Sequence, residues 1–426
     1  MTNNNMAARP CQVIRRNILL CTNVSQPNSG TSVQVTTRCT GHLHLLYDVR
    51  TKATEGFIMN ASAGSTTEKR DYNEHAIRTA EKLTEARLAA VKKVREASPP
   101  PAREDLFHDG NRSGLGVALE YEVMGNQPVS DDLQSRADSF GYRFEHLATT
   151  IGTIIHDIDL KEDLSQEQVK FIRDTLLERK IIGFRDQHLS EDQQVAFGRL
   201  FGDLDAFPFG PPGDNPYILE IRHGKRSPGT ENSWHTDVTW MEEPSLGSIA
   251  QCIEVPPYGG DTLFSDSHAC YQGLPTELKE RLPYLRGIND YRVFLGGGHR
   301  SQLPEDLINQ IKQDIPFGVE HPLCRTHPET GKPSLYIHGG FLRHDSLYDT
   351  RTDDTLPEDE SSAIVTRLLT QHNRPEYICR FQWEEGSVAF WDNRALQHYA
   401  ASDYFPHSRI LRRVTVSGDR PFCDIV

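Results

Sequence analysis

From residue 217 onwards the sequence is a series of short apolar segments of strand length, separated by Gly- and Pro-containing turns. The segments cover 217–222, 246–254, 261–264, 333–338, 377–382, 387–391 and 409–417. Helical patterns are confined to the intervals near 266–281, 303–314 and 358–372. A parallel sheet would need a crossover helix between most strands. This order therefore favours a mainly β fold with peripheral helices, a double-stranded β-helix or jelly roll.

The segment just before these strands extends the same domain. Apolar runs at 151–155 and 181–184 predict two buried strands. Helices are predicted over 165–180 and 190–201, because each range begins with a serine N-cap and has an acidic first turn. We therefore predict a compact domain over residues 142–426.

The first 141 residues differ in composition from this domain. Residues 1–47 contain four arginines but no Asp or Glu. Such a composition is found in organelle transit peptides, but a polar tail or a wrongly assigned start codon is the favoured interpretation. Good helix formers over 73–97 predict one exposed helix, which Pro99 ends. We predict an N-terminal extension over 1–141, largely disordered or a helical linker.

Charge and cysteine usage exclude several classes of partner. Lys and Arg total 46 against 60 acidic residues, a net charge of -14, which disfavours a broad surface for nucleic acid or anionic membrane. No apolar run has the ~20 residues that a membrane span requires. The eight cysteines show no C-x-x-C spacing and no signal-peptide core precedes them, so we interpret them as reduced thiols of a cytoplasmic protein, with mitochondrial import as the alternative. A homo-oligomer is expected on base rates alone.

Trp234-His235-Thr236-Asp237 is the first group of residues that suggests chemistry. Alternate residues of a strand point to the same face, so His235 and Asp237 can converge on one point. An ordinary His–Asp hydrogen bond at a strand end is the competing interpretation. The pair needs a third partner to indicate a metal site.

His398 supplies that third candidate, 163 positions after His235 and just beyond the apolar run 388–390. Two imidazoles and one carboxylate on one octahedral face bind Fe(II) and leave positions open for a cosubstrate and O₂. A histidine satisfied by a neighbour at a strand end is the alternative for His398 alone.

Arg409 and Arg413 lie on one face of the strand predicted over 409–417. Two inward arginines would be costly to bury without anions, and guanidinium groups recognise carboxylates and sulfonates well. Thr262, at the start of another strand, can offer a hydroxyl beside Arg409. The alternative is an edge strand whose arginines are solvated or paired with acidic residues.

These motifs resemble the TauD/TfdA family of Fe(II)/2-oxoglutarate dioxygenases over about residues 142–426. The resemblance is carried by Trp234 to Asp237, Gly259 to Thr262, Arg325 to Pro328, and the long run Trp391 to Pro421. It implies that His235, Asp237 and His398 bind Fe(II), and that Arg409 and Thr262 hold the distal carboxylate of 2-oxoglutarate. Arg413 falls where taurine-like members bind the anionic head group of the substrate.

The departures from the family concern the substrate. Phe207 and Gly210 stand where taurine-specific members place a His and a Tyr, and Glu231 stands where they have an Asn. Phe341 matches an aromatic residue that covers the taurine pocket, although a plain core phenylalanine is the competing interpretation. Taurine is therefore disfavoured, and an anionic substrate with a more apolar body near Phe207 fits better.

The resemblance thus implies a dioxygenase that hydroxylates a small anionic organic substrate, such as an alkylsulfonate, an alkyl sulfate or a carboxylate, with succinate and CO₂ as co-products. A desaturase or cyclising oxidase on the same scaffold stays open, because it would keep every residue named above. A catalytically silent anion-binding module is a further alternative. Asp237 argues against a halogenase, and no general-base Glu beside the ligands supports a zinc hydrolase.

Overall fold

The computed structural model describes residues 111–207, 215–229, 231–292, 304–314 and 318–424, with short segments before residue 102. It divides into two compact units, Met1–Pro101 and Ala102–Val426. In the first unit, described strands form two small antiparallel sheets: β1 (Gln12–Val13) with β2 (Leu19–Leu20), and β3 (Gln34–Arg38), β4 (His44–Asp48) and β5 (Asn60–Ala61). Residues 81–89 are helical and exposed, within the helix predicted over 73–97. Most of the rest of residues 1–110 lies outside the described residues.

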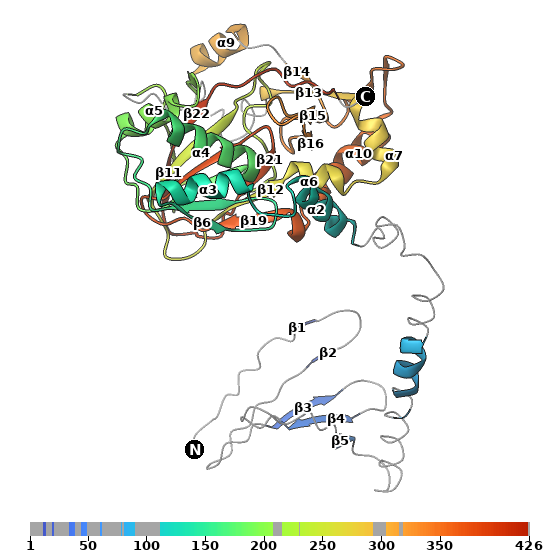
Figure 1. The fold of residues 1–426 in the computed structure, drawn as a ribbon. Coiled ribbons are helices and arrows are strands. Elements are labelled where there is room, and N and C mark those ends of the chain that lie inside the picture. Colours follow the sequence, from blue (N-terminus) through green and yellow to red (C-terminus); the bar gives the residue numbers. More distant parts are fainter. Residues whose placement is uncertain are drawn as a thin grey trace, which may run out of the picture. The chain divides into compact units, whose positions relative to one another are not determined.

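An eight-stranded sheet is the framework of the second unit (Figure 1). Its central path runs β10, β22, β11, β20, β8, β7, β6, and β9 pairs with β22. All pairs are antiparallel except β7 with β8. The strands are β6 (Arg143–His146), β7 (Thr153–His156), β8 (Ile181–Phe184), β9 (Leu204–Asp205), β10 (Leu219–His223), β11 (Gly247–Glu254), β20 (Val388–Asp392) and β22 (Arg409–Val416).

A second sheet packs on one face of this framework. It contains β19 (Ile378–Phe381), β12 (Thr262–Asp266) and β21 (Leu396–Ala400), in that order. One apolar cluster joins the two sheets, with Ala250 and Leu411 from the large sheet and Phe264, Phe381 and Leu396 from the small one. Burial of such side chains on alternate strand positions holds the two sheets together.

Helices cover the opposite face of the large sheet. α3 (Asp131–Phe140), α4 (Gln166–Arg179) and α5 (Glu191–Arg199) contribute to a cluster that also contains Ile249 of β11 and Phe390 of β20. Ser165 and Ser190 form complete capping boxes at the starts of α4 and α5. The helices predicted over 165–180 and 190–201 are therefore confirmed, and so is the mainly β architecture with peripheral helices.

The second unit begins earlier than the expected boundary at residue 142. α2 (Arg112–Val123) buries Leu115 and Glu120, and α3 inserts Leu133 and Ala137 into the core. These helices were not predicted because the segment from 102 to 140 is rich in polar and small residues and its few apolar side chains have no sustained period. Their side chains are nonetheless integral to the packing of the domain.

The remaining elements surround the small sheet. The predicted helix over 266–281 is two helices, α6 (Ser267–Gln272) and α7 (Thr276–Arg281), separated by Gly273 and Pro275. α9 (Glu305–Asp314) and α10 (Glu358–Gln371) lie where helices were predicted. The other elements are η2 (Leu282–Tyr284), β13 (Leu285–Asn289), β14 (Val319–Pro322), β15 (Cys324–Thr326), β16 (Pro333–Leu335), β17 (Tyr348–Asp349), β18 (Asp354–Thr355) and η4 (Pro375–Tyr377). Among the described residues, no helix is both long and apolar enough for a membrane crossing, and no disulfide is formed.

Candidate active site

A short β-bridge joins His235 to His398 across the sequence. The amide of His235 donates to the carbonyl of His398 at 3.0 Å, and the amide of His398 donates back at 2.7 Å. The centroids of the two imidazole rings are 4.0 Å apart. His398 lies on β21, which pairs with β12. The bridge therefore brings together two histidines that are far apart in the chain.

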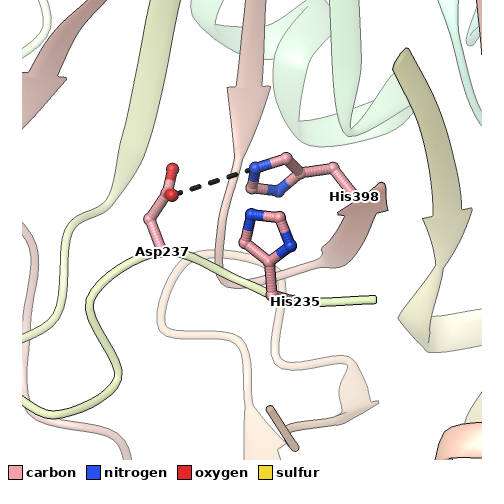
Figure 2. A group of neighbouring side chains, drawn as sticks. All are labelled: His235, Asp237 and His398. Atoms are coloured by element: carbon pink, nitrogen blue, oxygen red, sulfur yellow. Dashed lines mark ion pairs between the residues drawn. The ribbon is translucent and has the colours of Figure 1, made fainter. Parts of the chain in front are cut away.

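Asp237 completes a group of three converging side chains (Figure 2). The ligand atoms of His235, Asp237 and His398 all lie within 4.8 Å of one another. His398 Nε2 is 3.8 Å from Asp237 Oδ1. Nδ1 of His235 lies 2.7 Å from the carbonyl of Ser233, to which it donates, so Nε2 keeps the lone pair that a metal needs.

Three neighbours hold the carboxylate of Asp237. Oδ2 accepts hydrogen bonds from Ser248 Oγ at 2.8 Å and from Asn393 Nδ2 at 3.4 Å, while Oδ1 accepts one from Arg413 at 2.9 Å. Burial alone would raise the pKa of Asp237. Arg413 and then the two histidines outweigh this effect and hold that pKa well below its usual range. Asp237 is therefore ionised at neutral pH.

The donor chemistry of this group fits Fe(II). Burial first, and then the neighbouring His235, hold the pKa of His398 well below its usual range, which keeps its imidazole neutral. Neutral imidazoles with one ionised carboxylate are the ligand set of the 2-His-1-carboxylate triad. The convergence of His235, Asp237 and His398 that the sequence predicts is present in the structure.

Arg409 and Arg413 point toward the interior from the same face of β22. They are 2% and 9% exposed, and β22 lies between β10 and β11, so the alternative of a solvated edge strand is wrong. Arg409 donates to the carbonyl of Gly260 at 2.6 Å. In the described part of the chain its Nε is buried without a hydrogen-bond partner, which leaves a donor for an anion.

Gly260 makes room for Arg409 at the entry of β12. Its φ is +76°, and a Cβ built there would lie 3.2 Å from Arg409 Cδ and 3.2 Å from the ring of Tyr404. Thr262, two residues on, accepts a hydrogen bond from Trp383 Nε1 at 3.0 Å, so its own hydroxyl proton is still available. This corner offers a guanidinium and a hydroxyl to a carboxylate.

An aromatic cluster lies on the Arg413 side of the site. The guanidinium of Arg413 is 5.8 Å from the ring centroid of Phe207. Phe207 packs, with Met241, against a buried cluster of Phe341, Val238, Trp240 and Tyr291. The two phenylalanines that the sequence assigned to substrate binding therefore belong to one apolar wall. Gly210 lies outside the described residues, and Glu231 pairs with His223 at 3.0 Å.

Three residues near the triad were not singled out from the sequence. Asn393 accepts from Trp391 Nε1 at 3.0 Å and donates to Ser245 Oγ at 2.8 Å, which fixes the amide that contacts Asp237. Ser248 lies on the inward face of β11, where strand alternation could have revealed it. His338 lies 5.6 Å from His235, ring to ring, and no local pattern marks it.

Most of the second unit matches a known protein family. The model described as "Taurine catabolism dioxygenase TauD, TfdA family" matches residues 143–415. The chain belongs to this family. It is 35% identical over 279 residues to an alkylsulfatase of Acinetobacter baylyi, covering 64% of this chain and 84% of the relative. An alpha-ketoglutarate-dependent sulfate ester dioxygenase of Pseudomonas putida is 34% identical, with coverage of 65% and 89%.

Solved structures agree with this assignment. A taurine dioxygenase from Burkholderia xenovorans has a TM-score of 0.55 and 34% identity, covering 66% of this chain and 90% of that chain. The TauD/TfdA assignment, predicted from the motifs, is confirmed. The protein is accordingly an oxidoreductase, a dioxygenase that uses Fe(II), 2-oxoglutarate and O₂.

Proposed function

We propose that this enzyme oxidises a sulfate ester or sulfonate that carries an apolar alkyl or aryl body. The observation that carries the proposal is the position of Arg413, a buried cation 5.8 Å from the Phe207 ring and next to a wall of aromatic side chains. A guanidinium binds an oxyanion, whereas an apolar wall favours a hydrocarbon. The sulfate ester and alkylsulfatase activities named for the two relatives support the same class.

In this proposal His235, Asp237 and His398 hold the iron, and Arg409 with Thr262 holds the distal carboxylate of 2-oxoglutarate. The iron and cosubstrate supply the oxidation of a C–H bond by O₂, with 2-oxoglutarate converted to succinate and CO₂. Asn393 and Ser248 fix the orientation of the Asp237 carboxylate through their hydrogen bonds to Oδ2. This arrangement keeps Oδ1 directed toward the two histidines.

The remaining steps depend on orientation by the chain. Arg413 holds the sulfo group, and Phe207 and Phe341 exclude water from the hydrocarbon part of the substrate. Hydroxylation of the carbon that bears the sulfate oxygen gives a hemiacetal-like product. That product loses sulfate as its C–O bond breaks, and its hydroxyl becomes the carbonyl of an aldehyde after release of one proton.

We further infer that the two facing sheets form the double-stranded β-helix of the sequence prediction. The support is the shared core between β11, β20 and β22 on one side and β12, β19 and β21 on the other. His235 and His398 lie together at these sheets because His398, on β21, forms a β-bridge with His235. A homo-oligomer and a cytoplasmic location stay predictions.

Anaerobic spectroscopy tests this function. Fe(II) and 2-oxoglutarate are added to the protein, and the visible metal-to-ligand charge-transfer band is recorded for the wild type, His235→Ala and Arg409→Ala. We expect the band in the wild type, no band in His235→Ala, and a band only at much higher 2-oxoglutarate in Arg409→Ala. Absence of the band from the folded wild type would overturn the assignment of the metal site.

A substrate titration then tests the substrate class. Hexyl sulfate, hexanesulfonate and taurine are each added to the anaerobic complex, and the shift of the band gives their affinities. We expect tight binding of the hexyl compounds and weak binding of taurine, because taurine carries a charged amine where the wall is apolar. Tight and saturable turnover of taurine would contradict the proposal.

A further inference from the structure

His338 lies beside the metal-binding group but belongs to none of the roles assigned so far. It follows β16 by three residues and is 5% exposed. Its ring is 5.6 Å from the ring of His235 and 3.9 Å from the ring of Phe341, at an interplanar angle of 31°. It therefore stands between a proposed iron ligand and the aromatic wall proposed to contact the substrate.

Backbone hydrogen bonds determine the tautomer of His338. Its Nδ1 lies 2.8 Å from the amide nitrogen of Gly340 and 2.9 Å from that of Phe341. Both amides are donors, so Nδ1 must accept and cannot carry a proton. A neutral ring with an accepting Nδ1 carries its proton on Nε2, which is therefore a fixed hydrogen-bond donor.

The Nε2–H group of His338 has no acceptor in the part of the chain that the structure describes, since its two hydrogen bonds there both involve Nδ1. Nδ1 of His398 also lacks a partner, but that atom is fully buried, whereas Nε2 of His338 is not. A neutral, oriented donor at this position can serve an oxygen atom of a bound molecule.

We propose that His338 is a substrate-recognition residue whose Nε2–H donates a hydrogen bond to an oxygen of the substrate's sulfo group. The inference rests on the proposed function and adds a second contact to it. Arg413 on β22 supplies the charge, and His338, after β16, supplies a neutral donor from a different element. Phe207, which lies beside Arg413, has no side-chain donor, so His338 would supply a polar contact that Phe207 cannot make.

The position of His338 also explains how the head group and the body of the substrate are separated. Its ring packs against Phe341 at a tilt of 31°, and Phe341 belongs to the apolar cluster with Val238, Trp240 and Tyr291. The donor therefore marks the polar border of the aromatic wall. In this proposal the oxygens of the sulfo group are shared between Arg413 and His338, and the hydrocarbon part packs on the apolar cluster that contains Phe341.

Two substitutions separate recognition from a purely structural role. His338→Gln places an amide N–H at about the position of Nε2 but loses the acceptor for the amides of Gly340 and Phe341. His338→Asn keeps an acceptor at about the position of Nδ1 and loses the distant donor. Affinities for hexyl sulfate and 2-oxoglutarate are measured by calorimetry with Mn(II) in place of Fe(II), so that no turnover is required.

We expect His338→Asn to bind hexyl sulfate roughly 10- to 100-fold more weakly, the effect of one lost hydrogen bond to a charged group. His338→Gln is expected to stay within about 5-fold of the wild type. Both variants should bind 2-oxoglutarate as the wild type does, which shows that the site is folded. Unchanged hexyl sulfate affinity in His338→Asn, or a larger loss in His338→Gln, would overturn the role of His338. A wild type that binds 2-oxoglutarate but neither hexyl sulfate nor hexanesulfonate would instead overturn the proposed substrate class and the role of His338 with it.

Discussion

Replacing Glu120 by glutamine is expected to destabilise the catalytic unit by about 3 kcal/mol, although Glu120 lies outside the region that matches the family. Glu120, on α2, and Lys180, after α4, are 1% and 0% exposed. Lys180 Nζ is 2.9 Å from Glu120 Oε1 and 2.9 Å from Asp266 Oδ2. Lys332 Nζ lies 2.7 Å from the same oxygen of Glu120. Two buried carboxylates thus balance two ammonium groups.

The magnitude follows from the proton affinity of Glu120. Burial alone would raise its pKa, but Lys180, His268 and Lys332 outweigh this and lower the pKa from 4.5 to about 2. At ~1.4 kcal/mol for each tenfold change in proton affinity, this lowering corresponds to about 3 kcal/mol. Glutamine keeps the shape and one acceptor but leaves the cluster with one uncompensated positive charge. The cost of an unpaired buried charge has the same order, about 3–5 kcal/mol.

Urea unfolding followed by circular dichroism measures this cost, with Glu122→Gln as the matched control. Glu122 is exposed on the same helix, so its substitution should cost under about 0.5 kcal/mol. Because the pKa of Glu120 is lowered on folding, its stabilising contribution is complete above pH ~4.5 and disappears as the pH falls toward 2. The gap between wild type and Glu120→Gln should therefore shrink over that interval. Equal stabilities of the two variants at pH 7, or a gap that persists in acid, would refute this reasoning.

Three further substitutions probe the site. Asn393→Ala removes the amide that orients Asp237, so Mn(II) affinity should fall roughly 10- to 100-fold by calorimetry, and an unchanged affinity would argue against that orienting role. Gly260→Ala adds a Cβ at a φ of +76°, which should displace Arg409 and raise the KM for 2-oxoglutarate several-fold while the KM for the substrate stays constant. Phe207→His should raise the ratio of kcat/KM for taurine to that for hexyl sulfate. An unchanged ratio would show that Phe207 does not determine substrate specificity.

Local sequence signals were sufficient for much of the framework. The serine caps at 165 and 190 predicted α4 and α5, since a capping box depends only on residues three apart. Strand alternation placed Arg409 and Arg413 on one face of β22, as the structure shows. The same rule would have identified Ser248, had its partner Asp237 been known to lie beside β11. Contacts within one element were therefore predictable from that element alone.

Contacts between distant segments were not predictable in this way. The bridge that joins His235 to His398 depends on the pairing of β21 with β12, which no local pattern specifies. Triad chemistry made His398 a candidate partner of His235, and the resemblance to a family then implied that the two histidines share one metal site. His338 was missed because two backbone amides that follow it determine its tautomer. A tautomer cannot be predicted from the sequence pattern. α2 was missed because its buried face contains one large apolar residue, Leu115, beside small residues and the charged Glu120, whose partners come from other parts of the chain.

The contact between Arg413 and Asp237 limits where the substrate can be oxidised. The guanidinium is 2.9 Å from the carboxylate oxygen that faces the two histidines, so an anion held by Arg413 lies directly beside the metal-binding group. The carbon attached to the sulfo group is then the one closest to the reactive centre, whatever the length of the hydrocarbon tail. We therefore expect release of one sulfate for each 2-oxoglutarate consumed with butyl, hexyl and decyl sulfate alike, measured by ion chromatography. Hydroxylation near the end of the decyl chain, with sulfate retained, would show that Arg413 does not hold the head group.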